Sequence, residues 1–224
     1  MRILIYGAGV IGSIFAGKLM LAGNDVTVLA RGKRLEEIRR NGIVLAGPGS
    51  RKVRRIPVKT IGALEPDDRY EYVIVAVQRT QIDELLPVLS ENCSPNIVLV
   101  VNTAAGYEPW AAALGRERLM LGFPSAGGER RQGAVLYFVG RGFQRVFQTT
   151  TFGEYSGERT GRVRILISLF NRARIPSVYC KNMDAWQKTH VALVSPIANA
   201  LYAFDCDNSR LGHSREYIRQ MVLA

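Results

Sequence analysis

The sequence predicts an α/β fold: a Rossmann-type doubly wound sheet with added antiparallel strands, followed by a short helical C-terminal domain expected to be truncated. Short β-rich segments, several apolar on both faces, alternate with segments of helical periodicity over the first three quarters of the 224-residue chain. Continuous apolar strands of this kind belong in a parallel sheet covered by helices on both sides. A glycine-rich hexapeptide also stands between the first strand and the first helix, which is typical of the doubly wound class.

The strands are expected from their β-rich composition and from the turn residues around them. Five parallel strands are predicted, at residues 2–6, 25–29, 72–77, 96–101 and 118–122, and a last short one at 176–180. Residues 43–60, with a turn at Pro48 and Gly49, should form an excursion or hairpin at the sheet edge. Residues 134–139 and 145–149 resemble paired antiparallel strands, joined by residues 140–144, that would extend the sheet.

Helices are expected between the strands because apolar residues recur there with helical spacing. The first carries one apolar face made of Ile11, Ile14, Phe15, Leu19 and Ala22. A second spans residues 82–89 after the expected N-cap Thr80, with Pro87 kinking or shortening it. A third covers residues 163–170, a long helix runs over residues 184–204 through Pro196, and residues 215–223 are compatible with another.

The hexapeptide follows the GxGxxG pattern and consists of Gly7, Ala8, Gly9, Val10, Ile11 and Gly12. In this pattern the first glycine permits a tight turn, the second lets a pyrophosphate approach the backbone, and the third lets helix and strand pack closely. The helix then directs free N–H groups and its positive end at the phosphates. Because an apolar strand precedes the loop and an amphipathic helix and a second strand follow it, a dinucleotide site is favoured over a ligand-free glycine turn.

The end of the second strand indicates which nicotinamide dinucleotide is bound. An NAD site usually has an acidic residue about 20 residues after the glycine loop, whereas an arginine there accommodates a 2′-phosphate. This chain has Arg31 and no carboxylate until Glu36. Arg31 can make a forked contact to the phosphate, with Lys33 or Arg34 adding charge. Simple solvated cations are the alternative, but they are electrostatically unfavourable at a helix start, so NADP(H) is predicted.

The order of these motifs resembles that of the ketopantoate reductase family, whose members reduce 2-ketopantoate to pantoate with NADPH. The resemblance rests on the glycine loop, the segment around Arg31, Asn102 after a later strand, and Trp186 with Lys188 at the start of the long helix. It implies that Lys188 is the catalytic lysine and that Asn102 positions nicotinamide and substrate. It also implies a cofactor contact at Gln78, in the loop after the third strand.

This assignment is chemically coherent, because hydride delivery to a 2-oxo carbon places negative charge on oxygen, which a fixed ammonium stabilises. Lys188, Ala192, Ser195 and Asn199 have the spacing of one helix face. Ser195 and Asn199 are therefore expected to bind substrate. The alternative is that both satisfy backbone groups around the Pro196 kink. His190 points elsewhere on the helix and is interpreted as structural.

Several positions depart from the family pattern. Family members usually have a lysine where this chain has Gln78 and an asparagine where it has Ala192, and the family's glycine-rich turn is here residues 103–106. The family's helical domain also continues well beyond the point where this chain stops. Residues 1–181 are thus interpreted as an NADP-binding Rossmann domain and residues 182–224 as the beginning of a helical substrate and dimerisation domain. Cofactor binding has better support than pantoate synthesis.

The leading hypothesis is an NADPH-dependent reductase of a small 2-oxo acid, resembling the 2-dehydropantoate 2-reductase of pantothenate and coenzyme A biosynthesis. Gln78 and Ala192 motivate a second hypothesis, a non-catalytic NADP(H)-binding sensor or partner-binding protein. A third would use the basic residues 31–40 and 51–55 to bind nucleic acid. It is disfavoured because no aromatic residues interleave with them and no nucleic-acid motif is found; no nucleic-acid partner is expected.

Composition limits the remaining possibilities. The chain has 30 Lys and Arg against 19 Asp and Glu, a net charge of +11, which favours anionic partners. The cysteines are odd in number and lack CxxC spacing, so we expect three buried thiols, a reducing cytoplasmic location and neither disulfide nor metal site. No apolar run reaches the roughly 20 residues that span a membrane. Apolar residues of the helical end should be exposed and favour a homodimer; they are Leu193, Ile197, Leu201 and Tyr202.

Overall fold

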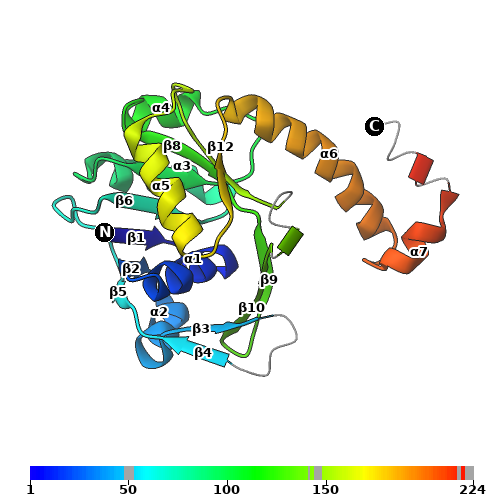
Figure 1. Ribbon diagram of the computed structural model, residues 1–224, viewed down its shortest axis with the longest axis horizontal. Helices are drawn as coiled ribbons and strands as arrows, with labels where there is room; N and C mark the ends of the chain where they lie inside the picture. Colours follow the sequence, from blue (N-terminus) through cyan, green and yellow to red (C-terminus); the bar gives the residue numbers. More distant parts are fainter. Residues whose placement is uncertain (48–52, 141, 144–147, 216–217, 220–224) are drawn as a thin grey trace. The chain divides into compact units, whose positions relative to one another are not determined.

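The computed structural model describes residues 1–47, 53–140, 142–143, 148–215 and 218–219 (Figure 1). Internal contacts divide the chain into two units, which are described separately. The first unit comprises Met1–Val101 and Tyr107–Met183, and the second comprises Asn102–Gly106 and Asp184–Ala224. Within the part of the chain that is described, no helix has the length and apolar character needed to cross a lipid bilayer.

The first unit is built on an eight-stranded sheet with the order β12-β11-β8-β7-β6-β1-β2-β5. All neighbouring strands are parallel except β8 and β11. The strand β1 pairs with β2 on one side and β6 on the other, so the chain order reverses there. Ligands of doubly wound sheets bind at such a reversal, beyond the carboxyl ends of the strands. The strands are β1 (Arg2–Tyr6), β2 (Asp25–Leu29), β5 (Lys59–Ile61), β6 (Tyr72–Val75), β7 (Ile97–Val100), β8 (Leu119–Phe123), β11 (Thr150–Glu154) and β12 (Ser177–Tyr179).

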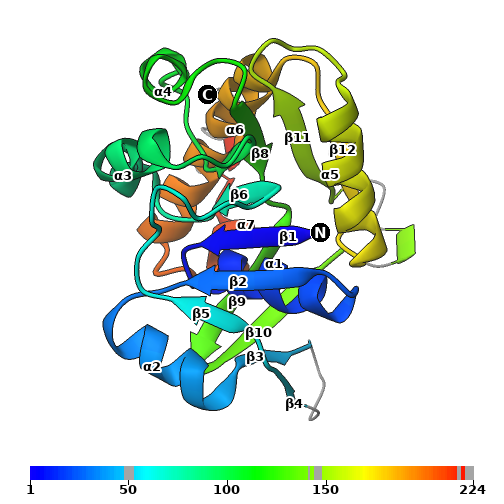
Figure 2. The same cartoon turned by 90° about the vertical axis from the view of Figure 1, so that its left-hand side faces the viewer.

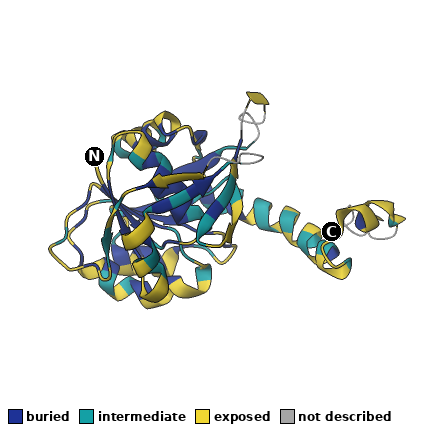
Figure 3. Cartoon of the chain, turned by 90° about the horizontal axis from the view of Figure 1, so that it is seen from below, coloured by how far each residue is buried: buried dark blue, intermediate teal, exposed yellow. Residues whose placement is uncertain are grey.

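Both faces of this sheet are buried, as the apolar strands predict (Figure 3). Along β1, Ile3 and Ile5 belong to the apolar cluster of α1 and α5, whereas Leu4 and Tyr6 belong to that of α3 and α4. Figure 2 shows α5 on one side of the sheet and α3 and α4 on the other. The predicted fold class is confirmed. The helices of this unit are α1 (Val10–Leu21), α2 (Gly32–Asn41), α3 (Arg79–Glu91), α4 (Glu108–Leu114) and α5 (Gly161–Arg172).

A second, four-stranded sheet with the order β4-β3-β10-β9 packs on α1. At Gly17 an added Cβ atom would lie 2.7 Å from Leu45 Cδ1 and 3.0 Å from Ile56 Cδ1, so the sheet approaches the helix closely at this point. The helix is thus buried on two sides, rather than on the single face expected from its periodicity. The strands are β3 (Ile43–Ala46), β4 (Val53–Ile56), β9 (Ala126–Arg131) and β10 (Ala134–Val139).

Two strand predictions need correction. The predicted strand at residues 134–139 forms, but its two neighbours in the sheet are β9 and β3. Gln132 and Gly133 both have positive φ, 48° and 81°, which is the two-residue turn that matches hairpin twist. The expected hairpin within residues 43–60 also forms, but in the second sheet; β5 supplies the edge of the large sheet. The expected turn at Pro48 and Gly49, and residues 145–147, lie outside the described residues.

Two smaller predictions are wrong. The helix α3 begins at Arg79, so its N-cap is Gln78 and not Thr80; the Gln78 N–H donates to Gln81 Oε1 at 3.1 Å. Cys93 and Cys206 are exposed and Cys180 is half-buried; the first two lie in the segments that follow α3 and α6, outside the helices and strands.

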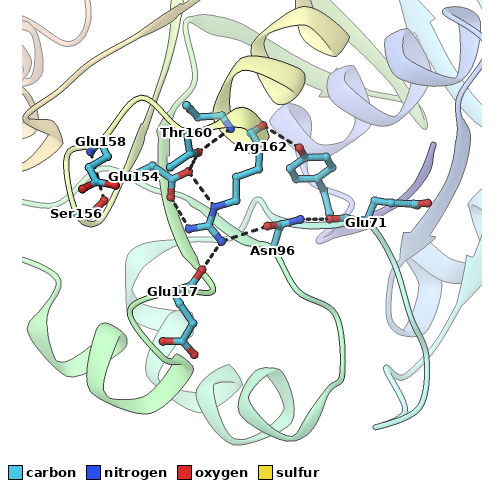
Figure 4. A network of polar contacts seen from close by, with 10 residues as sticks. Glu71, Asn96, Glu117, Glu154, Ser156, Glu158, Thr160 and Arg162 are labelled. Atoms are coloured by element: carbon cyan, nitrogen blue, oxygen red, sulfur yellow. Dashed lines mark hydrogen bonds and ion pairs between the residues drawn. The ribbon is translucent and has the colours of Figure 1, made fainter.

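The amino ends of the strands are tied together by a buried polar network (Figure 4). The Glu154 carboxylate is almost fully buried, pairs with Arg162 and accepts the Thr160 hydroxyl. Arg162 also donates to Asn96 Oδ1 at 3.1 Å and to the Glu117 carbonyl. Asn96 directly precedes β7, Glu117 lies two residues before β8, and Glu154 ends β11, which is antiparallel to β8. The network therefore holds together the end of the sheet opposite the glycine loop.

The second unit contains α6 (Met183–Ala203), whose first residue belongs to the first unit, and α7 (Asn208–His213). The predicted helix over residues 184–204 is confirmed, and it continues through Pro196. Most of the helix expected at residues 215–223 lies outside the described residues. Among the four apolar residues expected to be exposed, Leu193, Ile197 and Tyr202 are exposed, whereas Leu201 is half-buried.

Candidate functional site

The glycine loop lies at the carboxyl end of β1, where the chain order of the sheet reverses. Gly7 has φ +105°, and an added Cβ there would lie 2.7 Å from the Ala76 carbonyl oxygen. A Cβ on Gly12 would lie 1.9 Å from the Gly7 carbonyl oxygen. The fold itself therefore requires both glycines. A Cβ on Gly9 would meet no atom within 4 Å, so this glycine leaves open space above the loop.

The open space lies at the amino end of α1. Gly9 is the N-cap, with extended backbone and no side-chain cap, and the first turn contains no acidic residue. The first N–H groups of a helix have no partner within it, and the helix dipole adds positive potential there. The residues of the loop, Gly7, Ala8, Gly9, Val10, Ile11 and Gly12, therefore fit a pyrophosphate held by backbone N–H groups.

Arg31 stands at the carboxyl end of β2, beside the strand that carries the glycine loop. Its side chain is exposed, and Nη2 donates to the Tyr6 hydroxyl oxygen at 3.1 Å. Tyr6 is the buried last residue of β1. Because the fork of an arginine has five N–H groups, this bond orients the guanidinium and leaves donors for an anion. Sequence reasoning missed Tyr6; its only signal is a hydroxyl directly before Gly7.

Arg34 has a different environment, although it lies only three residues further along. Its side chain is 12% exposed. Nε donates to the Ala8 carbonyl at 3.1 Å and Nη2 to Ser13 Oγ at 3.0 Å. Arg34 therefore supports the loop from within the protein, and the expectation that it adds charge to a 2′-phosphate site needs correction. Lys33, which is exposed, is the other cation of this turn.

Gln78 lies at the carboxyl ends of the strands, as the glycine loop does. It is the exposed N-cap of α3, three residues after the end of β6. Pairing of β6 with β1 continues beyond the strand, where the Ala76 N–H donates to the Tyr6 carbonyl at 2.9 Å. An amide at this place can contact the base or ribose of a dinucleotide as donor or acceptor.

In the second unit a buried glutamine joins the Asn102 loop to α6. The Thr103 N–H donates to Gln187 Oε1 at 2.9 Å, and Gln187 is fully buried. Asn102 itself is exposed. The loop is thus fixed to the helical turn that carries Lys188. Sequence reasoning gave Gln187 no role, because its burial and its backbone partner 84 residues away leave no local pattern.

Lys188 forms an ion pair with Asp184, one turn earlier, with Nζ 2.6 Å from Oδ2. The two side chains are 52% and 43% exposed, and exposed pairs contribute only about 0–1 kcal/mol. The ammonium can therefore exchange this partner for an anionic ligand at little cost. Ala192, Ser195 and Asn199, which share its helix face, are also exposed.

His190 is held by ring stacking on Trp186, with ring centroids 5.3 Å apart and planes inclined by 3°. Burial lowers the pKa of His190 below its usual value, which favours the neutral form of the imidazole. Neither this region nor any other described part of the chain groups three or more side chains suited to holding a metal ion.

Comparisons with known proteins point to one family. A family model described as ketopantoate reductase PanE/ApbA matches residues 3–157. The 2-dehydropantoate 2-reductase of Pyrococcus horikoshii is 28% identical over 204 residues, which are 90% of this chain and 64% of that protein. The chain spans between 56% and 64% of the length of this and two other curated relatives that it matches.

Solved structures show the same fold. The structure of 2-dehydropantoate 2-reductase from Geobacter metallireducens superposes with a TM-score of 0.75 at 23% identity, covering 90% of this chain and 64% of that one. D-mandelate dehydrogenase, solved with NADH and anilino(oxo)acetate, superposes with a TM-score of 0.81 at 16% identity, covering 99% of this chain and 70% of that one. At these identities the likeness concerns the fold alone.

Proposed function

Because the chain belongs to the ketopantoate reductase family, we propose that it binds NADP(H) and reduces the ketone of a small 2-oxo acid. Ketopantoate, or a 2-oxo acid of similar size, is the proposed substrate. The observation that carries this proposal is the pairing of an open glycine loop at Gly9 with an exposed Arg31 at the end of the next strand. Together they suit the pyrophosphate and the 2′-phosphate of one dinucleotide.

The choice of NADP(H) rests on Arg31, since the fold does not decide it: D-mandelate dehydrogenase has the same fold and was solved with NADH. The first turn of α2 contains no acidic residue that would repel a 2′-phosphate or accept the 2′-hydroxyl of NAD. Arg31 would bind the 2′-phosphate, and the backbone of residues 9–12 would bind the pyrophosphate. Gln78 and Asn102 would complete the cofactor site. Residues 1–181 would form the NADP-binding domain.

The chemistry would come from the second unit, as part of a helical substrate and dimerisation domain that begins at residue 182. NADPH supplies a hydride when it is bound. Lys188 would stabilise the negative charge that develops on the ketone oxygen and donate a proton to it. Asn102 would position nicotinamide and substrate, while Ser195 and Asn199 would hydrogen-bond the carboxylate or hydroxyl of the substrate.

The test of this proposal compares cofactor affinities in the wild type and in Arg31→Gln. Removing a forked charge-assisted contact should weaken NADPH binding by roughly 10- to 100-fold, while NADH, which lacks the 2′-phosphate, should bind as before. Arg39→Gln is the matched control, because Arg39 lies on the same helix and is exposed with only a surface pair to Glu36. Titration by protein fluorescence gives both constants. Equal wild-type affinity for NADPH and NADH, or affinity for neither, would contradict the proposal.

A second candidate is a non-catalytic NADP(H)-binding sensor or partner-binding protein. It is favoured by Ala192, which offers no polar group one turn after Lys188. Tight NADPH binding without turnover of any 2-oxo acid, also in a chain extended to the length of the relatives, would support this candidate over a reductase.

A further inference from the structure

One side chain connects the glycine loop with three other parts of the first unit. The Arg34 guanidinium donates to the Ala8 carbonyl in the loop, to Ser13 Oγ in α1 and, at 3.0 Å, to Glu37 in α2. Its Nη1 also lies 3.5 Å from the carbonyl oxygen of Gly133, at the tip of the β9–β10 hairpin. A planar group with donors at fixed angles can satisfy several acceptors only if they keep their relative positions.

The contact with Ala8 determines the orientation of the loop. Ala8 is buried, and its carbonyl accepts both Arg34 Nε at 3.1 Å and the Ser13 hydroxyl at 3.3 Å. A peptide whose carbonyl is held on the inner side directs the N–H of the next residue, Gly9, to the outer side, because the two groups of a planar peptide point in opposite directions. That outer side is the open space over Gly9.

We propose that Arg34 is a positioning residue for the pyrophosphate of the bound dinucleotide, which rests on the proposed function above. It holds the Ala8 peptide so that the N–H groups after it converge on the phosphates, without touching the phosphates itself. Its contact with Gly133 makes the tip of the second sheet part of this support. The two arginines at the start of α2 thus have separate roles. Arg31 binds the 2′-phosphate, and Arg34 holds the glycine loop in the conformation that binds the pyrophosphate.

The test uses two probes that separate the two halves of the site. ADP-ribose contains the pyrophosphate but no 2′-phosphate, and adenosine 2′-monophosphate contains the 2′-phosphate but no pyrophosphate. In Arg34→Gln the dissociation constant of ADP-ribose should rise by roughly tenfold or more, as expected for losing a charge-assisted hydrogen bond. Adenosine 2′-monophosphate should bind with wild-type affinity. Arg39→Gln on the same helix should change neither constant.

A conservative variant distinguishes geometry from charge. Arg34→Lys keeps the positive charge but cannot bridge Ala8 and Ser13 with one planar group, so ADP-ribose should still bind more weakly than to the wild type. Wild-type affinity in Arg34→Lys would overturn the positioning role, because charge alone would then suffice. Equal weakening of both probes in Arg34→Gln would also overturn it, because the arginine would then support the whole fold and not the loop.

A second variant keeps the proposal testable if Arg34→Gln does not fold. Ser13→Ala removes one acceptor of Arg34 and one donor to the Ala8 carbonyl with only a small change in volume. It should weaken ADP-ribose selectively, and an unchanged affinity would count against the inference. A wild-type protein that binds neither probe would overturn the proposed function as well, whereas wild-type binding that no variant alters would overturn the role of Arg34 alone.

Discussion

At the scale of single residues, surroundings decide what each charged side chain can do. Arg31 and Arg34 lie one helical turn apart, but Arg34 finds oxygen acceptors on the loop, on α1 and on its own helix. Arg31 contacts the Tyr6 hydroxyl and is otherwise open to solvent. Arg34 therefore supports the fold from within, and Arg31 is suited to bind an external anion.

Lys188 gives the first residue-scale prediction. If it stabilises charge on the ketone oxygen, Lys188→Ala should lower kcat with 2-oxo acids by roughly 10²- to 10⁴-fold, the usual range for a proton-transferring group. NADPH affinity should remain unchanged. Steady-state oxidation of NADPH and a separate binding titration measure the two effects.

Asp184→Asn is the matched control for Lys188. It removes the carboxylate partner of the lysine but leaves the ammonium, and the pair is exposed, so its loss should change kcat far less than Lys188→Ala does. Failure of every 2-oxo acid to support turnover in the wild type would remove the catalytic assignment, and with it this prediction.

At the scale of elements, α1 serves both sheets of the first unit. Its amino end carries the glycine loop, and its middle lies against the second sheet at Gly17, with Leu45, Ile56 and Ile43 around the missing side chain. Because the helix contacts sheets on two sides, there is no space for a larger side chain at Gly17.

We therefore expect Gly17→Val to destabilise the protein by about 1–3 kcal/mol, the usual range for overpacking a core. Gly161→Val is the control, because an added Cβ at this first residue of α5 meets nothing within 4 Å. Urea unfolding followed by circular dichroism measures both. If the two variants lose the same stability, the close contact between α1 and the second sheet is not what limits this position.

The polar network at the amino ends of the strands predicts an effect of alkaline pH. Burial raises the pKa of Tyr72 from 10.0 to about 12, and its hydroxyl donates to the Arg162 carbonyl at 2.8 Å. Between these values the unfolded chain releases the tyrosine proton and the folded chain keeps it. Fewer protons are then bound in the unfolded state, so the free energy of unfolding decreases as pH rises from 10 to 12.

Tyr72→Phe isolates this contribution, since the other tyrosines remain. The variant should be less stable at neutral pH, by about 1 kcal/mol for one hydrogen bond, but should lose less stability than the wild type as the pH is raised through this window. Unfolding curves at several pH values provide the comparison. Parallel pH profiles for the two proteins would show that Tyr72 does not retain its proton.

At the scale of the whole molecule, the two ends of the strands in the large sheet have opposite properties. The carboxyl ends of β1, β2 and β6 present the open glycine loop, Arg31 and Gln78, while the amino ends are locked by Glu154 and its partners. The groups proposed to bind the dinucleotide are thus placed where the backbone leaves donors unused, and the groups that hold the strands are placed at the other end.

The second unit predicts self-association, in line with the proposed homodimer. Leu193 and Tyr202 are 65% and 77% exposed, and Ile197 is also exposed; such apolar surface is unfavourable in water. Sedimentation velocity should show an average mass above that of one chain, and Leu193→Lys combined with Ile197→Lys should lower it. A single monomeric species at all concentrations would exclude this association.

Local patterns in the sequence were sufficient for the class of fold, and the proposed dinucleotide site rests on them as well. The alternation of apolar strands and helices, the spacing of Gly7, Gly9 and Gly12, and Arg31 after the second strand can all be read within short windows. Strand and helix periodicity and positive φ at a turn depend on neighbouring residues, so these features were predictable.

Only the tertiary structure decided which distant segments meet. The second sheet joins β3 and β4 with β9 and β10, whereas the sequence predicted that residues 134–139 pair with residues 145–149. Arg34 and Gln187 gained their roles from acceptors and donors 26 and 84 residues away. Burial and hydrogen bonding of a polar side chain depend on what the folded chain places around it, and no local window of sequence contains that information.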